Sequence, residues 1–223
     1  YSQVELRVMA HMSNDETMIK AFNSDADIHT ICASQVFNVP IENVSKELRS
    51  RAKAVNFGIV YGISDFGLAE QIGVSRKIAK EYINQYLEKY NGIKEFMDNI
   101  VEEAKKNEYV ETLFKRRRYI PELKSNSYMV RQFGSRVAMN TPIQGTAADI
   151  MKIAMIDVFN KLEENNLKSK IILQIHDELI IETLQEEKEI VRKILKESME
   201  NAIKLKVPLL VELQEANNWY DAK

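Results

Sequence analysis

Residues 169–184 read SKIILQIHDELIIETL, two runs of apolar and β-branched residues on either side of a polar centre. This pattern is typical of a β-hairpin, because β-branched residues favour strands and the short polar segment favours a turn. The turn carries His176, Asp177 and Glu178, whereas a turn selected for backbone geometry favours Asn-Gly or Asp-Gly. Since most other segments have helical periodicity, this hairpin decides the fold class, which we predict to be α+β.

The acidic turn suggests a site for a hard divalent cation. Carboxylate oxygens suit Mg²⁺, and a pair of strands holds its turn residues rigidly. In the alternative interpretation, Asp177 and Glu178 are ordinary solvated turn residues. The hairpin by itself leaves both interpretations open.

Most of the remaining chain has helical periodicity, and caps and punctuating residues set the expected boundaries. We predict helices over residues 4–12, 16–22, 28–37, 46–61, 68–72, 75–90, 95–106, 128–140, 146–165 and 186–205. Ser45 is the predicted N-cap of the long helix that follows it, and Pro142 and Gly145 are expected to separate two helices. Strand character is expected over residues 109–120, and a final strand is expected near residues 208–213.

The helix expected over residues 46–61 carries an uncommon face. Its side chains Arg49, Lys53, Phe57 and Tyr61 are each four positions apart, so they form one slowly winding stripe. Cations at one end and rings at the other fit a nucleotide that lies along the helix, with its phosphates at Arg49 and Lys53. The alternative is a set of core aromatics beside cations whose stems cover apolar surface.

Composition is that of an ordinary globular protein, with 223 residues, 45% hydrophobic and 29% charged residues and a net charge of -2. Basic residues nevertheless gather in residues 113–136, and acidic residues gather in residues 1–45 and after Glu178. This asymmetry fits a polyanion on part of the surface, although a charge run is more often a solvated face. The lone Cys32 excludes a disulfide framework, and no run approaches the ~20 apolar residues of a spanning helix.

Residues 62–69 read GISDFGLA and contain the DFG tripeptide of protein kinases. A kinase also needs a glycine-rich loop, a strand lysine and an H-R-D catalytic loop upstream, and the sequence contains none of them. We therefore expect Ser64 and Asp65 to cap the next helix and Phe66 to pack beneath it.

Four segments, in order and at the right spacing, resemble motifs of family A DNA polymerases. They are YSQVELR at residues 1–7, R-x-x-x-K-x-x-x-F-x-x-x-Y-G at 49–62, RVAMNTPIQGTAADI at 136–150 and QIHDEL at 174–179. The resemblance covers essentially the whole chain and implies a right-hand polymerase fragment with mostly helical fingers and part of an antiparallel palm sheet. Residues 1–15 would begin the palm, residues 16–135 would form the fingers, and residues 136–223 would complete the palm with the hairpin.

The resemblance also implies roles for individual residues. Arg49 and Lys53 would grip the incoming deoxynucleoside triphosphate, and Lys53 would protonate the pyrophosphate leaving group. Phe57 would stack near the sugar and base, and Tyr61 would lie on the side of the template base. Glu5 would occupy the space of a ribose 2′-hydroxyl and so select deoxynucleotides.

By the same resemblance, residues near the hairpin and in the third motif would meet the DNA. Arg136, Asn140 and Gln144 would contact the backbone or minor groove at the primer end, and His176 would lie near the primer terminus. His29 is expected to be structural. The implied partners are primer–template DNA and deoxynucleoside triphosphates, with no membrane and no obligate protein partner.

Asp177 would hold paired Mg²⁺ ions that activate the primer 3′-hydroxyl and steady the leaving oxygens, and Tyr1 would offer its carbonyl oxygen. In the family a second aspartate immediately precedes the tyrosine that matches Tyr1. Residues 1–223 alone are therefore expected to be inactive, although the parent protein would be a polymerase. The implied setting is DNA replication or repair at the nucleoid in the bacterial cytoplasm.

Two other classes stay open. Residues 68–83, LAEQIGVSRKIAKEYI, read like a helix-turn-helix, which would make the chain a sequence-specific DNA-binding module. The dipeptide His176 and Asp177 also occurs in HD-type metal phosphohydrolases, but that fold sets its histidines on helices. Neither class explains the stripe that begins at Arg49 together with the acidic hairpin.

Overall fold

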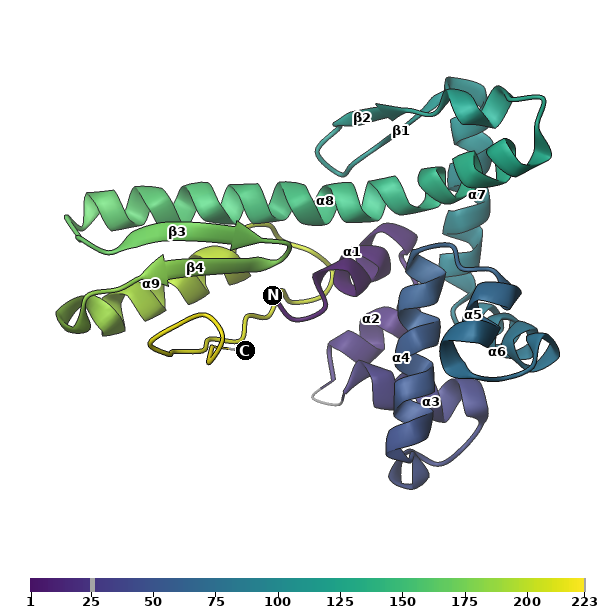
Figure 1. Ribbon diagram of the computed structural model, residues 1–223, viewed down its shortest axis with the longest axis horizontal. Coiled ribbons are helices and arrows are strands. Elements are labelled where there is room, and N and C mark those ends of the chain that lie inside the picture. The colour runs from purple at the N-terminus through teal and green to yellow at the C-terminus, as the bar shows by residue number, and fades with distance from the viewer. Residues whose placement is uncertain (25–26, 223) are drawn as a thin grey trace. The chain divides into compact units, whose positions relative to one another are not determined.

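The computed structural model describes residues 1–24 and 27–222 of the chain. Many helices and two short hairpins make up the described residues (Figure 1). In chain order the elements are α1 Val4–Ser13, α2 Glu16–Phe22, α3 Ile28–Phe37, η1 Ile41–Asn43, α4 Lys46–Val60, α5 Asp65–Ile72, α6 Arg76–Lys89, α7 Asn91–Asn107, β1 Tyr109–Glu111, β2 Arg117–Tyr119, η2 Pro121–Lys124, α8 Tyr128–Glu164, β3 Lys170–Ile175, β4 Glu178–Glu182, η3 Gln185–Glu187 and α9 Lys188–Glu200. Each sheet found in this part of the chain is two-stranded and antiparallel, which confirms the α+β class.

The chain divides into two compact units. One unit is Glu5–Thr146, and the other combines Tyr1–Val4 with Ala147–Lys223. The first contains most of α1, the helices α2 to α7, the β1–β2 hairpin and the beginning of α8. The second contains the rest of α8, the β3–β4 hairpin and α9. The assignment of residues 16–135 to fingers and of the flanking residues to palm stays a prediction.

Side-chain caps start most helices of the first unit. Serine and aspartate side chains accept a hydrogen bond from a backbone N–H of the first turn, which satisfies one of the donors that a helix start leaves open. These N-caps are Asp15, Asp27, Ser45, Ser64 and Ser75. The helices then pack around one another, with α4 against α3 and α5, and α6 against α3, α5 and α7. The predicted caps Ser45 and Ser64 are confirmed.

The packing predicted for Phe66 is wrong. Its side chain is 58% exposed, whereas Leu68 and Ala69 are the residues of α5 that are buried. Two positions along a helix correspond to a rotation of about 200°, so burial of Leu68 turns Phe66 towards solvent. The DFG tripeptide is therefore the start of a capped surface helix.

The break predicted near Pro142 and Gly145 is also wrong, because α8 is one continuous helix from Tyr128 to Glu164. Proline lacks an N–H, and in a helix interior it removes the bond to the carbonyl four residues earlier. A rule that considers only the local sequence correctly gives this cost of proline. It takes no account of contacts between the helix and neighbouring elements.

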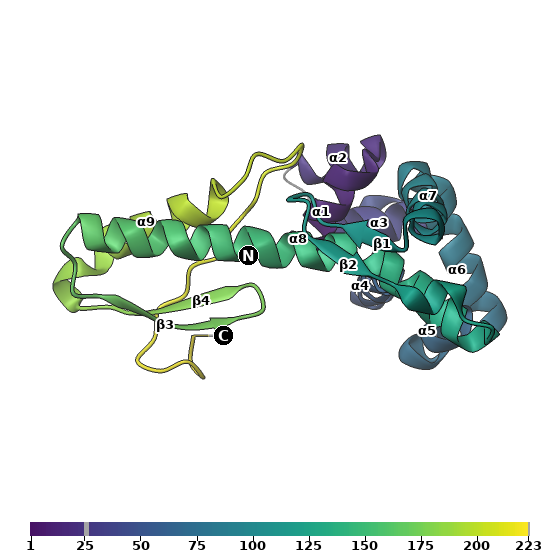
Figure 2. The ribbon, with the colours of Figure 1, turned by 90° about the horizontal axis from the view of Figure 1, so that it is seen from above.

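Those neighbours belong to the β1–β2 hairpin, which lies beside the middle of α8, near Gly145 (Figure 2). The Arg116 guanidinium donates to the Gly145 carbonyl at 3.0 Å, and the Leu113 N–H donates to the Thr146 hydroxyl at 2.9 Å. A Cβ on Gly145 would lie 2.6 Å from the Thr112 methyl group. Gly145 is therefore required for close packing of the hairpin and does not end the helix.

In the second unit the β3–β4 hairpin packs with the helices α8 and α9 (Figure 1). Its strands pair antiparallel, with Ile175 opposite Glu178, so the turn contains only two residues. Apolar residues of both helices form the core beneath the hairpin: Val158, Leu162, Val191 and Ile194. The predicted hairpin is confirmed, but Glu178 begins β4 and does not lie in the turn.

The end of the chain differs from the prediction. No strand is found near residues 208–213 in the described part of the chain, and α9 ends at Glu200, before the predicted residue 205. One backbone bond, from the Ser2 N–H to the Leu210 carbonyl at 2.8 Å, is present in this region. The apolar residues of this segment thus favour a strand, but the segment does not pair continuously with a neighbouring strand.

None of the described helices combines the length and the apolar character that a membrane span needs.

Candidate functional site

The predicted stripe lies on one helix. Arg49, Lys53 and Phe57 belong to α4, and Tyr61 is its C-cap residue. Arg49 and Lys53 are exposed, Phe57 is half-buried, and Tyr61 is 42% exposed. The four side chains therefore share an accessible face with cations at one end and rings at the other. This is the arrangement that the sequence predicted.

Arg49 is held by a carboxylate that the sequence analysis did not identify. Its Nε and Nη2 atoms each donate to Asp27, at 2.9 Å in both cases. Burial alone would raise the pKa of Asp27, but hydrogen bonds from Arg49 and Thr30 outweigh it and lower that pKa to about 2. Among the described residues, no carboxylate lies within ion-pair distance of the Lys53 ammonium.

Behind this face lies a buried polar pair. The Asn56 amide donates to Nδ1 of His29 at 3.1 Å, and the His29 ring lies 5.8 Å from the Phe57 ring between centroids. Burial lowers the pKa of His29 to about 4, although the charge of Asp27 acts in the opposite sense. His29 is therefore neutral near pH 7, in agreement with a structural role.

At the other end of the stripe, Tyr61 connects three elements. Its hydroxyl donates to Glu5 of α1 at 2.8 Å, and its backbone carbonyl accepts from the Asn140 amide of α8 at 3.3 Å. The Asn140 Oδ1 atom is buried and has no partner among the described residues. The structure thus brings together Tyr61, Glu5 and Asn140, which the sequence predicted from separate motifs.

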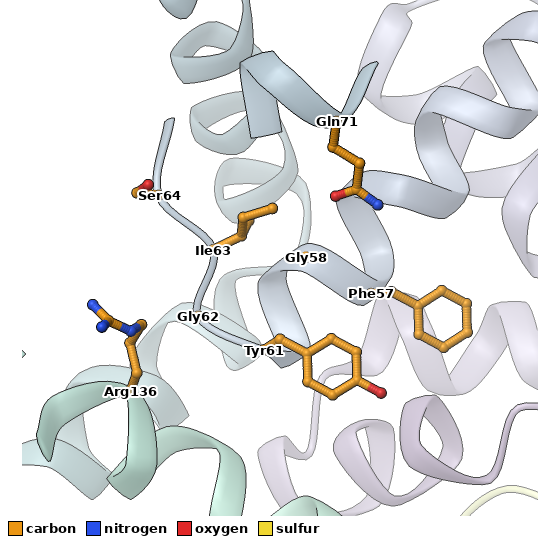
Figure 3. Close-up of a pocket in the computed structure, with 8 residues that line it drawn as sticks. All are labelled: Phe57, Gly58, Tyr61, Gly62, Ile63, Ser64, Gln71 and Arg136. Atoms are coloured by element: carbon orange, nitrogen blue, oxygen red, sulfur yellow. The ribbon is translucent and has the colours of Figure 1, made fainter. Parts of the chain in front are cut away.

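A pocket of about 460 Å³ opens beside Tyr61 (Figure 3). Its wall combines the aromatic end of α4, the turn that follows it and one cation of α8. The lining residues are Phe57, Gly58, Tyr61, Gly62, Ile63, Ser64, Gln71 and Arg136. Gly62 has a φ of 65°, in the left-handed region that favours glycine, and this conformation turns the chain away from α4.

The predicted DNA-contact residues Arg136, Asn140 and Gln144 all lie on α8. Arg136 is exposed, and its guanidinium carbon lies 6.0 Å from the centre of the Phe133 ring. Asn140 and Gln144 are half-buried. Spacing of four residues places the three side chains along one side of the helix, as predicted.

The β3–β4 turn presents the remaining predicted site residues. His176 has a φ of 46°, which is uncommon for a residue with a side chain, and its carbonyl accepts from the Gln174 amide at 2.9 Å. The Asp177 carbonyl accepts from the backbone nitrogen of Tyr1 at 2.8 Å. The Tyr1 hydroxyl donates to the Met199 carbonyl at 2.8 Å, which ties the beginning of the chain to the end of α9.

The oxygen atoms at this turn are the type of ligand that a hard cation prefers. Asp177 offers a carboxylate, Tyr1 offers a carbonyl, and Glu178 and Glu212 add negative charge around the Tyr1 nitrogen. No group of three His, Cys, Asp or Glu side chains with metal-binding geometry occurs among the residues that the structure describes. A metal bound at Asp177 would therefore need further ligands besides these residues.

Four residues near these sites were missed by the sequence analysis. Asp27, Asn56 and Gln71 lie beside the α4 stripe, and Gln174 lies beside the turn. Gln174 lies within the QIHDEL motif, and Asp27 had a local signal because an aspartate directly before a helical run is a common N-cap. Its pairing with Arg49 depends on how two helices pack, which one sequence does not encode locally.

Comparisons with known proteins give one family. Residues 1–221 match the family model described as DNA polymerase family A. DNA polymerase I of Caldicellulosiruptor bescii is 59% identical over 223 residues, which are 100% of this chain and 26% of that protein. DNA polymerase I of Bacillus subtilis is 55% identical over 100% of this chain and 25% of that protein. The chain thus spans about a quarter of the length of these relatives.

A solved structure agrees with these matches. It is the POL domain of Pol1 from M. smegmatis in complex with DNA primer-template and dNTP. The similarity has a TM-score of 0.95 and 43% sequence identity, and it covers 100% of this chain and 39% of the other.

Proposed function

Because the chain belongs to DNA polymerase family A, we propose that it supplies the nucleotide-binding helix and one metal-binding carboxylate of a DNA-directed DNA polymerase. The reaction would be template-directed transfer of a nucleotide from a deoxynucleoside triphosphate to a primer 3′-hydroxyl. The observation that carries this proposal is the α4 face, where exposed Arg49 and Lys53 precede Phe57 and Tyr61 on one helix. Such a face suits an anion followed by a ring system.

In this reaction the primer 3′-oxygen forms a bond to the α-phosphorus as the bond from that phosphorus to the bridging oxygen breaks. Pyrophosphate leaves with the electron pair of the broken bond, and the primer hydroxyl loses its proton to solvent water. Arg49 would bind the triphosphate with paired N–H donors, and Lys53 would donate a proton to the departing pyrophosphate. The exposed Lys53 ammonium fits this role, since it has no carboxylate partner among the described residues.

The aromatic end of α4 would select the nucleotide. Phe57 would stack near the sugar and base, and Tyr61 would lie on the template side, where it lines the pocket beside Arg136. Glu5 would exclude a ribose 2′-hydroxyl. Its carboxylate accepts a hydrogen bond from the Tyr61 hydroxyl at 2.8 Å, and this bond would keep it from moving aside for the extra oxygen.

The DNA would lie against α8 and the hairpin turn. Arg136, Asn140 and Gln144 would contact the backbone or minor groove, where base-pair shape can be tested without reading sequence. His176 would lie near the primer terminus. The solved M. smegmatis complex, which contains a primer-template and a dNTP, supports these partners for the present chain.

Members of this family are generally metal-dependent. We propose Mg²⁺ as the metal, two ions in the complete enzyme, with Asp177 and the Tyr1 carbonyl as ligands from this chain. The ions would lower the pKa of the primer hydroxyl and stabilise the charge of the leaving oxygens. Since the two relatives named above are bacterial DNA polymerase I proteins, the proposed setting is the nucleoid, in replication or repair.

The alternatives have less support. A helix-turn-helix module would use α5 and α6, but the family match extends over residues 1–221 and includes both helices. In an HD-type phosphohydrolase the histidine would lie on a helix, whereas His176 lies in a β-turn.

Primer extension by the full-length parent protein tests the proposal. Asp177→Asn should lower the Mg²⁺-dependent extension rate by at least about 100-fold, because even residues that only support metal ligands cost 10–100-fold when changed. Glu182→Gln is the matched control, since Glu182 is an exposed carboxylate at the end of β4. Equal rates for the Asp177→Asn variant and the unmodified protein would refute the metal role.

A further inference from the structure

We propose that Asp27 is a positioning residue for nucleotide binding, because it fixes the Arg49 guanidinium in the orientation that receives the triphosphate. This inference rests on the proposed function and adds a residue to it. The supporting contact is a two-bond ion pair between α4 and the residue that starts α3, with both donor–acceptor distances at 2.9 Å.

The geometry of the pair decides which part of Arg49 stays accessible. The bonds to Asp27 use Nε and one hydrogen of Nη2, which form one edge of the planar guanidinium. The two hydrogens of Nη1 and the second hydrogen of Nη2 stay available. The edge formed by Nη1 and Nη2 presents two parallel N–H donors, which is the fork geometry that suits a phosphate. Asp27 and a phosphate can therefore bind the same guanidinium at the same time.

Asp27 is itself well fixed. Its Oδ2 atom accepts from the Thr30 N–H and from the Thr30 hydroxyl, at 2.7 Å each, as the N-cap of α3. The helix α3 packs against α4, and the buried residues of α3 include His29 and Cys32. A carboxylate held by its own helix start can orient a long side chain that is 45% exposed and would otherwise sample many rotamers.

Another arginine on the same helix provides a comparison. Arg51 pairs with Glu47 through Nη2 at 2.7 Å, an i,i+4 contact within α4 in which the glutamate side chain is 73% exposed. Such a pair on one helix surface holds its partner weakly. Of these two arginines, only Arg49 is tied to a carboxylate of another helix, and it belongs to the predicted nucleotide face.

The test is steady-state and single-turnover nucleotide incorporation by the full-length parent protein carrying Asp27→Asn. Asparagine is as good an N-cap as aspartate, so α3 should keep its start, which a thermal melt checks. The two Arg49 bonds use both carboxylate oxygens of Asp27, whereas asparagine has an NH₂ donor in place of one oxygen, so one guanidinium N–H would face another donor. We expect the KM for the deoxynucleoside triphosphate to rise about tenfold, with kcat and the Kd for primer–template unchanged. Glu47→Gln is the matched control and should leave all three constants unchanged.

A second arm isolates the route through Arg49. In an Arg49→Ala background, Asp27→Asn should have no further effect on KM, because the group that it positions is gone. A KM that falls in Asp27→Asn would overturn the proposal, since Asp27 would then compete with the triphosphate. An unchanged KM, or the same rise in both backgrounds, would also overturn it. Arg49→Ala alone tests the proposed function separately: if it does not impair nucleotide use, the nucleotide role of Arg49 itself fails.

Discussion

The α4 face and the β3–β4 turn present the side chains of the proposed site in different ways. On α4 the backbone is a regular helix, and side chains from other elements hold the face, as Asp27 holds Arg49 and Glu5 holds Tyr61. At the turn the backbone itself is unusual, since His176 has a φ of 46°, and the Asp177 carbonyl is fixed by the backbone nitrogen of Tyr1.

A helical face and a strained turn make different demands on the sequence. A helical face requires only residues at the right spacing, and its precision comes from partners elsewhere in the chain. A strained turn requires a residue that tolerates a conformation favoured by glycine, and its precision comes from the strands on either side. Substitutions on α4 should therefore act mainly on chemistry and binding, and backbone substitutions should act mainly on stability.

The largest expected effect is on the α4 face. Lys53→Ala in the full-length parent should slow single-turnover incorporation by about 100-fold, or about 2.7 kcal/mol, because the general acid catalysis proposed for Lys53 contributes at least that much. Primer–template affinity should change little. Lys46→Ala is the control, since Lys46 is an exposed lysine in the first turn of the same helix. An equal loss of DNA affinity would contradict the nucleotide role of Lys53.

A backbone substitution at the end of α4 should destabilise the fold by a smaller amount. Gly62→Ala should cost about 2 kcal/mol, because Gly62 has a φ of 65° and a Cβ would lie 3.0 Å from the Met139 side chain. Gly73→Ala is the control, since Gly73 has a φ of 66° but no atom within 4 Å of such a Cβ. Chemical denaturation should show the larger loss for Gly62→Ala. Equal losses would mean that crowding at Gly62 is unimportant.

The opposite sign is expected at the turn. His176→Gly should raise the free energy of unfolding by about 0.5–1 kcal/mol. It removes the cost of a left-handed conformation, about 1–2 kcal/mol, but glycine loses more chain entropy on folding, which offsets part of this gain. Denaturant melts of the variant and the unmodified protein measure this. A less stable variant would mean that the His176 side chain contributes more than its backbone costs, and would remove the contrast between the turn and α4.

The smallest effect concerns acid stability. The pKa of Asp27 is lowered in the folded protein from 3.8 to about 2, so its contribution is present above pH 4 and is lost as the pH falls towards 2. The side chain is 34% exposed, so solvent screening limits the effect to below about 1 kcal/mol. Acid unfolding curves should show the unmodified protein losing stability over this range relative to Asp27→Asn. Parallel curves would contradict the ion pair.

The sequence predicted much of this architecture for identifiable reasons. Caps such as Ser45 and Ser64 lie next to the helices that they start, so local rules place them correctly. Spacing also predicted the α4 stripe. The failures depend on how elements pack. Pro142 stays within α8 beside a hairpin that approaches Gly145. Phe66 is exposed because α5 packs with Leu68 on its buried side.

The candidate site follows the same division. Residue type and order led to the proposed roles of Arg49, Lys53 and Asp177, because the charge and spacing of these side chains can be read from the sequence. Asp27 and Gln174 were not predicted, since each acts through a hydrogen bond whose partner is known only after folding. Local rules thus indicate which side chains carry the chemistry, and the packed structure adds the groups that position them.

The most direct measurement is a crystal structure of the full-length parent protein with primer–template DNA, Mg²⁺ and a non-hydrolysable deoxynucleoside triphosphate. We expect the triphosphate to lie on Arg49 and Lys53, and a Mg²⁺ ion to lie on the Asp177 carboxylate. A nucleotide bound away from α4, or a metal ion bound without Asp177, would contradict the proposed roles of these residues.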